Sequence, residues 1–178
     1  MTPAPTRPSV RRPGRAEIAE FYRGYVELVP EGDVLQELER GSQELRALLE
    51  PIGEERAQHR YAAGKWSIKE IVGHLADGER VFSYRALRMA RGDETPLPSF
   101  DQDAFVARAG SDQRQLADLL AELEHLRAAS VLLFRGLAPE AWERRGTASG
   151  VSFVVCAFPW ILRGHELHHR KVLAERYL

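Results

Sequence analysis

Two histidines close to the end of the sequence, His165 and His169, have a spacing that suits shared chemistry on a helix. Residues i and i+4 of an α-helix lie one above the other, so both imidazole rings can point at one spot. Neutral imidazole is a standard ligand of divalent metal ions, and this spacing presents two of them together. The pair therefore predicts a metal site, to which another segment must add a further ligand.

The neighbouring His168 could replace His169 in this pair on spacing alone. On a helical wheel of about 100° per residue, His169 lies about 40° from His165, inside the apolar stripe of this segment. His168 lies about 60° the other way, at the edge of that stripe, and Cys156 lies about 180° away. The wheel favours His169 and keeps His168 as an additional candidate near the site, whereas Cys156 is a poor ligand candidate.

His74 is the expected ligand from a second segment, because it lies mid-helix beside apolar positions. Asp77 follows three residues later on what we expect to be the same face, so it is a candidate weak ligand or partner of an imidazole. His59 and His125 lack such neighbours, and we expect them on the surface. A single buried histidine more often bonds a carbonyl or carboxylate oxygen, so the metal hypothesis depends on all three rings converging.

The segment His165-Glu166-x-x-His169 also matches H-E-x-x-H, in which the glutamate is the general base of a metalloprotease. Those enzymes usually take a third ligand from downstream, and only nine residues follow His169. There is also no clear strand to hold an extended peptide. We therefore disfavour the protease interpretation and keep Glu166 as a residue that could orient a ligand.

Four long amphipathic helices are expected to position these residues. The predicted ranges are 33–50, 67–92, 111–136 and 152–177, preceded by a short helix at 17–26. Asp33 can cap the first long helix, and Ser67 with Glu70 forms an S-x-x-E capping box at the second.

The intervening segment 93–110 is too long for a simple turn, which indicates a crossover between distant ends of a bundle or a functional loop. We find no period-two alternation and no hairpin signal. The sequence thus predicts an all-α four-helix bundle over residues 15–178, with a long crossover between the second and third long helices. Residues 1–14, rich in proline and arginine, predict a flexible tail.

The composition argues against a nucleic-acid-binding, a membrane-spanning or a secreted protein. The 25 Lys and Arg residues nearly balance the 26 Asp and Glu residues, so the basic patch typical of a nucleic-acid partner is not expected. No stretch approaches the roughly 18 apolar residues of a membrane span. The start of the sequence lacks the apolar core of a signal peptide, and a single cysteine forms no internal disulfide. We therefore expect a soluble cytoplasmic protein.

Three segments together resemble the DinB-like superfamily, also called the DinB/YfiT-like metalloenzymes. They are 61–80, which contains Lys-Trp-Ser-Ile-Lys-Glu, then Thr-Ala-Ser-Gly at 147–150, and Gly-His-Glu-Leu-His-His at 164–169. The resemblance extends from about residue 20 to 177. It implies a four-helix bundle, often a homodimer, in which three histidines bind Zn²⁺, Ni²⁺ or a similar ion. The three histidine ligands of the family correspond to His74, His165 and His169 in this sequence. Members of the family include bacillithiol-using thiol S-transferases and mycothiol-dependent isomerases.

Three imidazole ligands leave a coordination position open, as in catalytic metal sites. This open position, together with what the family resemblance implies, makes a thiol S-transferase our leading functional prediction, in which a low-molecular-weight thiol attacks a small electrophilic substrate. The alternatives are a metal-dependent hydrolase and a non-catalytic metal-binding module. Zn²⁺ or Ni²⁺ is the expected ion, with Fe²⁺ or Mn²⁺ as alternatives, because imidazole suits several metals.

Arg85 lies about 16 Å along the predicted helix from His74, so we expect it to form an ion pair rather than to take part in metal chemistry. The loop 91–105 carries Phe100 and Phe105 as candidate apolar contacts and Asp101 and Asp103 as candidate polar contacts. We expect this loop either to form the rim of a pocket or to be a solvated connection anchored by its aromatic rings.

Overall fold

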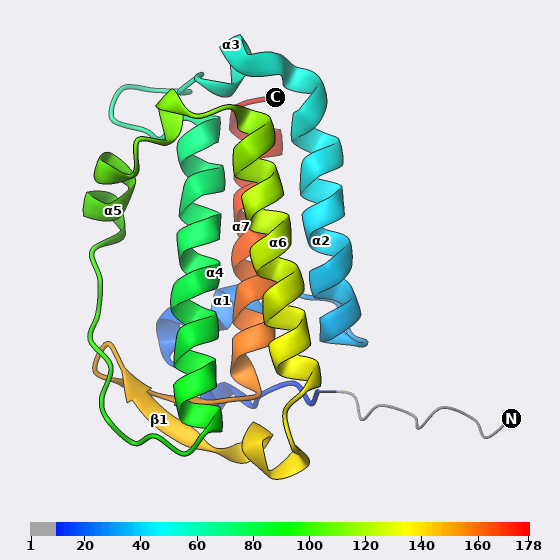
Figure 1. Ribbon diagram of the computed structural model, residues 1–178, viewed down its shortest axis with the longest axis vertical. Coiled ribbons are helices and arrows are strands. Elements are labelled where there is room, and N and C mark those ends of the chain that lie inside the picture. Colours follow the sequence, from blue (N-terminus) through cyan, green and yellow to red (C-terminus); the bar gives the residue numbers. More distant parts are fainter. Residues whose placement is uncertain (1–9) are drawn as a thin grey trace, which may run out of the picture.

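Four long helices lie side by side in the computed structural model, which describes residues 10–178 (Figure 1). They are α2 (Val34–Leu49), α4 (Ile68–Ala90), α6 (Leu116–Arg135) and α7 (Ala157–Arg176). Helices α2 and α7 run in one direction along the bundle, and α4 and α6 run in the other. Both α4 and α2 pack against α6 and α7. The predicted four-helix bundle is confirmed.

The chain must cross the length of the bundle between α4 and α6, because these helices run in the same direction. Residues 91–115 make this crossover outside α4 and include the short helix α5 (Gln102–Ala109) (Figure 1). Asp101 caps α5 by accepting hydrogen bonds from two backbone N–H groups of its first turn. The long crossover is confirmed, whereas α5 was not predicted, because eight residues give little periodicity to detect.

The helix starts follow the predicted caps. A carboxylate oxygen of Asp33 accepts a hydrogen bond of 2.9 Å from the backbone N–H of Leu35 at the start of α2. At the start of α4, the hydroxyl of Ser67 accepts from the N–H of Glu70 at 3.0 Å, and the carboxylate of Glu70 accepts from the N–H of Ser67 at 2.8 Å. This reciprocal capping box fixes where α4 begins, and thus which way His74 points.

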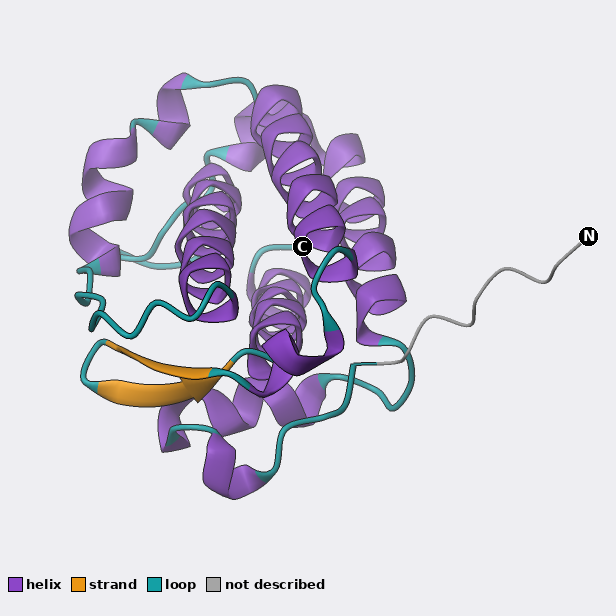
Figure 2. Ribbon diagram, turned by 60° about the horizontal axis from the view of Figure 1, so that its bottom comes forward, coloured by secondary structure: helices purple, strands orange, loops and turns teal. Residues whose placement is uncertain are grey.

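A two-stranded antiparallel hairpin precedes α7, where the sequence suggested only a loop and an earlier helix start (Figure 2). Its strands are β1 (Arg145–Ala148) and β2 (Val151–Val154), with Ala148 opposite Val151. The predicted helix start at 152 is therefore wrong, since α7 begins at residue 157. Four-residue strands are too short to show alternation, and the turn residues Ser149 and Gly150 both adopt positive φ.

The chain before α2 wraps the outside of the bundle. Helix α1 spans Glu20–Leu28, a little later than predicted, and packs against α7. Of the predicted tail 1–14, residues 1–9 lie outside the described residues. Residues 10–14 contact the bundle instead: Val10 is buried, and the carbonyl of Arg11 accepts a 3.0 Å hydrogen bond from Trp160.

Another short helix, α3 (Gly53–Ala57), links α2 to α4. Within residues 10–178, none of the helices is long and apolar enough to span a membrane.

The bundle core consists of two apolar clusters separated by a layer of buried charge. In the long helices, the charged residues Glu79, Arg127, Arg163 and Glu166 fall between the positions that belong to the two clusters. Arg127 lies 3.0 Å from a carboxylate oxygen of Glu79 and 2.8 Å from one of Glu166. It also donates a 3.1 Å hydrogen bond to the carbonyl of Leu38. Arg127 therefore ties all four long helices together at one level.

Gly164 permits close contact between α1 and α7. A Cβ atom at this position would overlap the backbone carbonyl group of Tyr25. Since backbone cannot move aside as a flexible side chain can, we expect Gly164→Ala to lower the free energy of unfolding by about 1–3 kcal/mol in urea titrations.

Gly24→Ala in the exposed middle of α1 is the matched control. No atom lies within 4 Å of the Cβ that it would add, so it should raise the free energy of unfolding by about 0.5–1 kcal/mol. Similar effects of the two substitutions would contradict this account of the contact.

Candidate metal centre

The three histidines singled out in the sequence meet inside the bundle. The Nε2 atoms of His74 and His165 lie 2.9 Å apart, and those of His165 and His169 lie 3.1 Å apart. One ring nitrogen from each of the three lies within 4.8 Å of the others. His74 and His165 are buried, and His169 is partly buried. Two helices that are distant in sequence thus bring three nitrogens to one spot.

The three histidines come together because α4 and α7 pack against each other in antiparallel directions. His74 projects from the middle of α4 toward α7, on which His165 and His169 lie one turn apart. Gly78, one turn after His74, makes the necessary room, since a Cβ there would lie 3.3 Å from the imidazole of His165. The His165 ring therefore rests against the backbone of α4.

A network of hydrogen bonds alone does not satisfy this arrangement. The Nε2 atom of His165 faces two other Nε2 atoms, but a neutral imidazole nitrogen carries either one hydrogen or one lone pair. It can therefore complete only one of the two contacts as a hydrogen bond. Three nitrogens bound to one tetrahedral ion at about 2.0–2.1 Å would lie about 3.3 Å apart, close to the spacings seen here. The donor set thus fits a shared cation.

Burial keeps these imidazoles uncharged. It lowers the pKa of His74 to about 4 and, with the help of neighbouring imidazoles, the pKa of His169 to about 3. Burial also lowers the pKa of His165 well below its ordinary value, and the adjacent rings reinforce the shift. At neutral pH the nitrogens therefore keep the lone pairs that a metal ion requires.

These shifts predict acid sensitivity of the metal-free protein. An unfolded histidine binds its proton at a pKa near 6.5, whereas folded His74 and His169 do so only near 4 and 3. Between pH 6.5 and 4 the unfolded state holds more protons, so stability should fall as the pH falls through this range. The slope should reach about 1.4 kcal/mol per pH unit for each histidine.

Urea unfolding of the metal-free protein at about pH 7.5 and about pH 5.0, on either side of the ordinary histidine pKa, measures this slope. His169→Gln should reduce the difference between the two pH values. His125→Gln should leave it unchanged, because that side chain is exposed. Equal stability of the unsubstituted protein at both pH values would contradict the assignment.

His168 lies beside the trio without joining it. Its ring centroid is 5.2 Å from that of His169 and 5.4 Å from that of Tyr25, and the side chain is half-buried. In the described part of the chain, the cluster of potential ligands contains His74, His165 and His169 alone.

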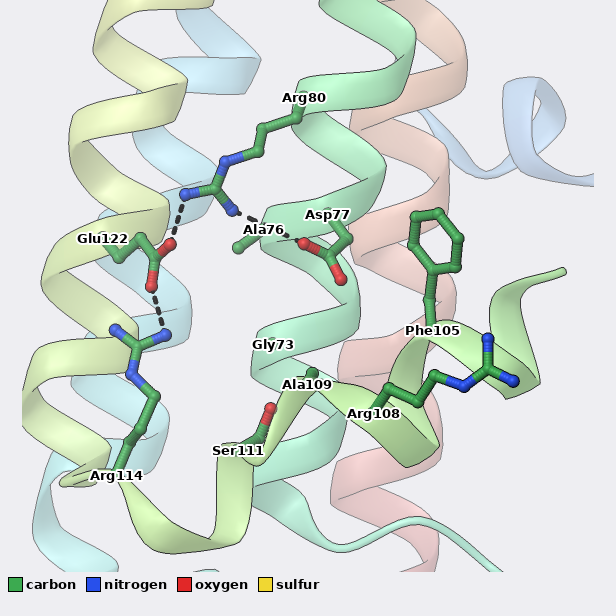
Figure 3. A pocket seen from close by; sticks show the side chains of 10 residues that line it. All are labelled: Gly73, Ala76, Asp77, Arg80, Phe105, Arg108, Ala109, Ser111, Arg114 and Glu122. Carbon is green, nitrogen blue, oxygen red and sulfur yellow. Dashed lines mark hydrogen bonds and ion pairs between the residues drawn. The ribbon is translucent and has the colours of Figure 1, made fainter. Parts of the chain in front are cut away.

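Asp77 does not approach the trio, contrary to expectation. It lines a separate pocket of about 400 Å³ with Arg80 and Phe105, and its carboxylate lies 3.5 Å from the Arg80 guanidinium (Figure 3). On α4, Gly78 is about 40° from His74 and faces α7, whereas Asp77 is about 60° away on the other side. Three-residue spacing was therefore insufficient to place both side chains at one site.

Glu166 is also directed away from the trio. Its two carboxylate oxygens are paired with Arg163 at 2.6 Å and with Arg127 at 2.8 Å inside the charged layer. A general base of the H-E-x-x-H type must face the metal ligands, so this geometry does not fit a metalloprotease. The predicted role of Glu166 as a partner of the ligands is wrong; it is part of the structural ion network.

Three residues near the trio were not among the predicted ligands or their predicted partners. The ring of Trp66 lies 4.7 Å from that of His74, and the ring of Tyr25 lies 5.4 Å from that of His165. Asp103, at the start of α5, is close enough for its charge to oppose the lowering of the His74 pKa. These residues come from three segments outside the predicted long-helix faces, so only the folded arrangement brings them together.

Two cavities flank the trio. The first, here called the aromatic cavity, has a volume of about 250 Å³ and is lined by His74, His165 and several aromatic rings. The second, the distal cavity, has a volume of about 350 Å³ and is lined by His168, His169 and Trp66 among others. Gln102 at the start of α5 lines both, so the crossover covers the region between them.

The chain is similar in sequence to one curated protein over part of its length. A protein of Oceanobacillus iheyensis, whose name places it among the putative metal-dependent hydrolases, is 31% identical over 72 residues, which span 40% of this chain and 41% of that protein. The match thus covers about two fifths of the curated relative.

Two solved structures share the fold. One is YfiT from Bacillus subtilis, described as a probable metal-dependent hydrolase with an unusual four-helix bundle topology. It superposes with a TM-score of 0.68 at 20% identity, over 83% of this chain and 90% of YfiT. The other is a mycothiol-dependent maleylpyruvate isomerase, which superposes with a TM-score of 0.65 at 18% identity, over 81% of this chain and 60% of the isomerase.

The sequence profile of the DinB superfamily matches residues 37–173, from α2 to the last turns of α7. This range includes all three converging histidines. Together with the bundle and its crossover, the match establishes that the chain belongs to the DinB superfamily.

Proposed function

We propose that His74, His165 and His169 bind one divalent metal ion, and that the protein is a metal-dependent enzyme acting on small molecules. The observation that carries this proposal is the meeting of three Nε2 atoms that hydrogen bonds alone do not satisfy. The names of two relatives, which refer to metal-dependent hydrolases, support it. Zn²⁺ or Ni²⁺ is the preferred ion, with Fe²⁺ or Mn²⁺ as alternatives.

A divalent ion held by three imidazoles would act as a Lewis acid and lower the pKa of a water or thiol bound at its open position. The surrounding residues would exclude water and orient the substrate. Trp66 packs against His74, and Tyr25 packs against His165. Burial raises the pKa of Tyr25, so its hydroxyl keeps its proton at neutral pH and can donate a hydrogen bond in the aromatic cavity.

For the reaction, our leading proposal is thiol S-transfer. A low-molecular-weight thiol would lose its proton to solvent water, and the resulting thiolate would attack an electrophilic carbon, forming a C–S bond as the leaving group departs with its electron pair. Such a reaction needs room for two organic molecules, and the aromatic and distal cavities border the trio from two sides. The mycothiol dependence of one structural neighbour is consistent with a thiol co-substrate.

Hydrolysis is the second candidate reaction, favoured by the names of the other two relatives. It requires one organic substrate and water, and its turnover would not depend on a thiol. Thiol dependence therefore distinguishes the two reactions.

The test begins with elemental analysis of the purified protein, which should contain about one divalent ion per chain. Metal-loaded protein is then incubated with monochlorobimane and bacillithiol, mycothiol or cysteine, and with 4-nitrophenyl acetate without thiol. Thiol-dependent turnover above the metal-free control supports S-transfer. Turnover of the ester alone supports hydrolysis and contradicts S-transfer.

A non-catalytic metal-binding module would behave differently in the same experiments. Chelation would then unfold the protein, as followed by circular dichroism, and neither reaction would exceed the metal-free control. The homodimer implied by the family resemblance stays a prediction, which light scattering of the purified protein would test.

A further inference from the structure

Arg85 is a buried cation that has no anionic partner among the described residues. Arg85 projects from α4 and is only 3% exposed. No carboxylate within residues 10–178 lies at ion-pair distance from its guanidinium group. The ion pair expected from the sequence is therefore not formed. Instead, its Nη2 atom donates to the carbonyl of Pro98 and to the hydroxyl of Ser149, both at 2.9 Å. An unpaired charge in this position is costly, which points to a missing anion.

The guanidinium group lies in the wall of the aromatic cavity, which also reaches His74 and His165. Its carbon atom is 5.6 Å from the ring centre of Phe82 and 5.9 Å from that of Phe100. The other lining side chains are aromatic or neutral and polar, and no Asp or Glu is among them. The cavity therefore carries a positive charge at Arg85, and its walls are mostly aromatic with a few neutral polar groups.

The hydrogen bonds to Pro98 and Ser149 orient the guanidinium group of Arg85 and leave other N–H groups of it to donate to a ligand. Both bonds use Nη2, and the hydroxyl of Tyr22, which lines the same cavity, is also close enough to interact with the guanidinium. The guanidinium carries three further N–H groups on Nε and Nη1, so donors remain for a ligand beside Tyr22. Pro98 belongs to the crossover, and Ser149 occupies the positive-φ turn of the hairpin. Two irregular segments thus hold the cation in a fixed orientation beside the cavity.

We propose that the aromatic cavity binds a small organic carboxylate, with its carboxylate group on Arg85 and its apolar part extending toward the three histidines. A guanidinium forms paired, charge-assisted hydrogen bonds with a planar carboxylate, and aromatic walls suit an unsaturated or aromatic body. The volume of about 250 Å³ suits a single-ring acid. That this acid is a substrate rests on the proposed function above, but its binding to the cavity does not.

The test uses benzoate as the probe and benzamide as its uncharged analogue. Calorimetric titration of the full-length, metal-free protein should give at least tenfold tighter binding of benzoate. Arg85→Gln should weaken benzoate binding at least tenfold and leave benzamide binding nearly unchanged. Arg88→Gln is the matched control, because Arg88 is one turn away on α4 and paired with Asp93 outside the cavity.

Equal affinity for benzoate and benzamide, or unchanged benzoate binding by Arg85→Gln, would overturn the proposal. Binding of inorganic phosphate in place of benzoate would also overturn the assignment to a carboxylate. If Arg85→Gln does not fold, Arg85→Lys keeps the charge but loses the paired geometry, and it should bind benzoate more weakly. The comparison of benzoate with benzamide in the unsubstituted protein needs no variant.

The result can be separated from that of the metal proposal. Benzoate binding that persists in a protein without detectable metal affinity would reject the metal centre and keep the carboxylate site. A protein that binds its ion but does not distinguish benzoate from benzamide would reject the carboxylate site and keep the metal centre.

Discussion

Replacing His165 with alanine is expected to reduce the metal affinity of the protein by more than about 100-fold, since loss of even an outer partner of a ligand costs about 10- to 100-fold. His165 is the residue whose Nε2 lies within 3.1 Å of both other nitrogens. Its removal leaves two imidazoles, which do not hold an ion firmly. Elemental analysis after dialysis, together with titration of Zn²⁺ into the metal-free variant, measures the loss.

His168→Ala is the matched control for this experiment. This histidine is adjacent to the trio in sequence and half-buried, but it is outside the cluster of ligand atoms. Its replacement should leave the stoichiometry and affinity of the ion unchanged. Equal losses in the two variants would contradict the assignment of ligands, and circular dichroism would establish that both variants are folded.

Arg127→Met should strongly destabilise the bundle core. It removes the cation that lies between Glu79 and Glu166, all of which are at most 3% exposed. Glu166 would keep Arg163, but Glu79 would lose its buried partner. An uncompensated buried charge costs about 3–5 kcal/mol, so the free energy of unfolding in urea should fall by that amount.

Arg46→Met serves as the control for burial. Arg46 also bridges two long helices, since it pairs with Glu124 of α6 at 2.7 Å, but both side chains are partly exposed. Its loss should cost no more than about 1 kcal/mol. Replacement of both Arg127 and Glu79 by methionine should recover part of the stability lost by Arg127→Met. A loss below about 1 kcal/mol for Arg127→Met would show that the charged layer contributes little.

Local sequence patterns predicted much of this fold. The caps at Asp33 and Ser67 operate over three residues, and the apolar stripes repeat over several turns, so both are visible without a structure. The hairpin before α7 and helix α5 escaped detection because each is short and depends on contacts with the rest of the bundle. The pairing of Leu97 with β1, for example, joins segments about 50 residues apart.

Two of the site predictions, for Asp77 and Glu166, and the ion pair expected of Arg85 failed for one reason. Asp77, Glu166 and Arg85 were placed by their positions along a helix, but each side chain's partner is set by the neighbouring elements. Asp77 lines the pocket next to α5, Glu166 joins the charged layer, and Arg85 contacts the crossover and the hairpin turn. Angles on a single helix do not reveal which neighbour occupies each side.

The amino-acid sequence alone was enough to specify the four amphipathic helices and the three histidines, because short-range periodicity governs both. The convergence of His74 with His165 and His169 follows only from the packing of α4 against α7. The charged layer also needs α2 and α6, and the two cavities also need α1, the crossover and the hairpin turn. His74 and His165 are 91 positions apart, and Glu79 and Arg127 are 48 apart. The geometry of these features depends on helix direction, helix contacts and the course of the crossover, which no local pattern encodes.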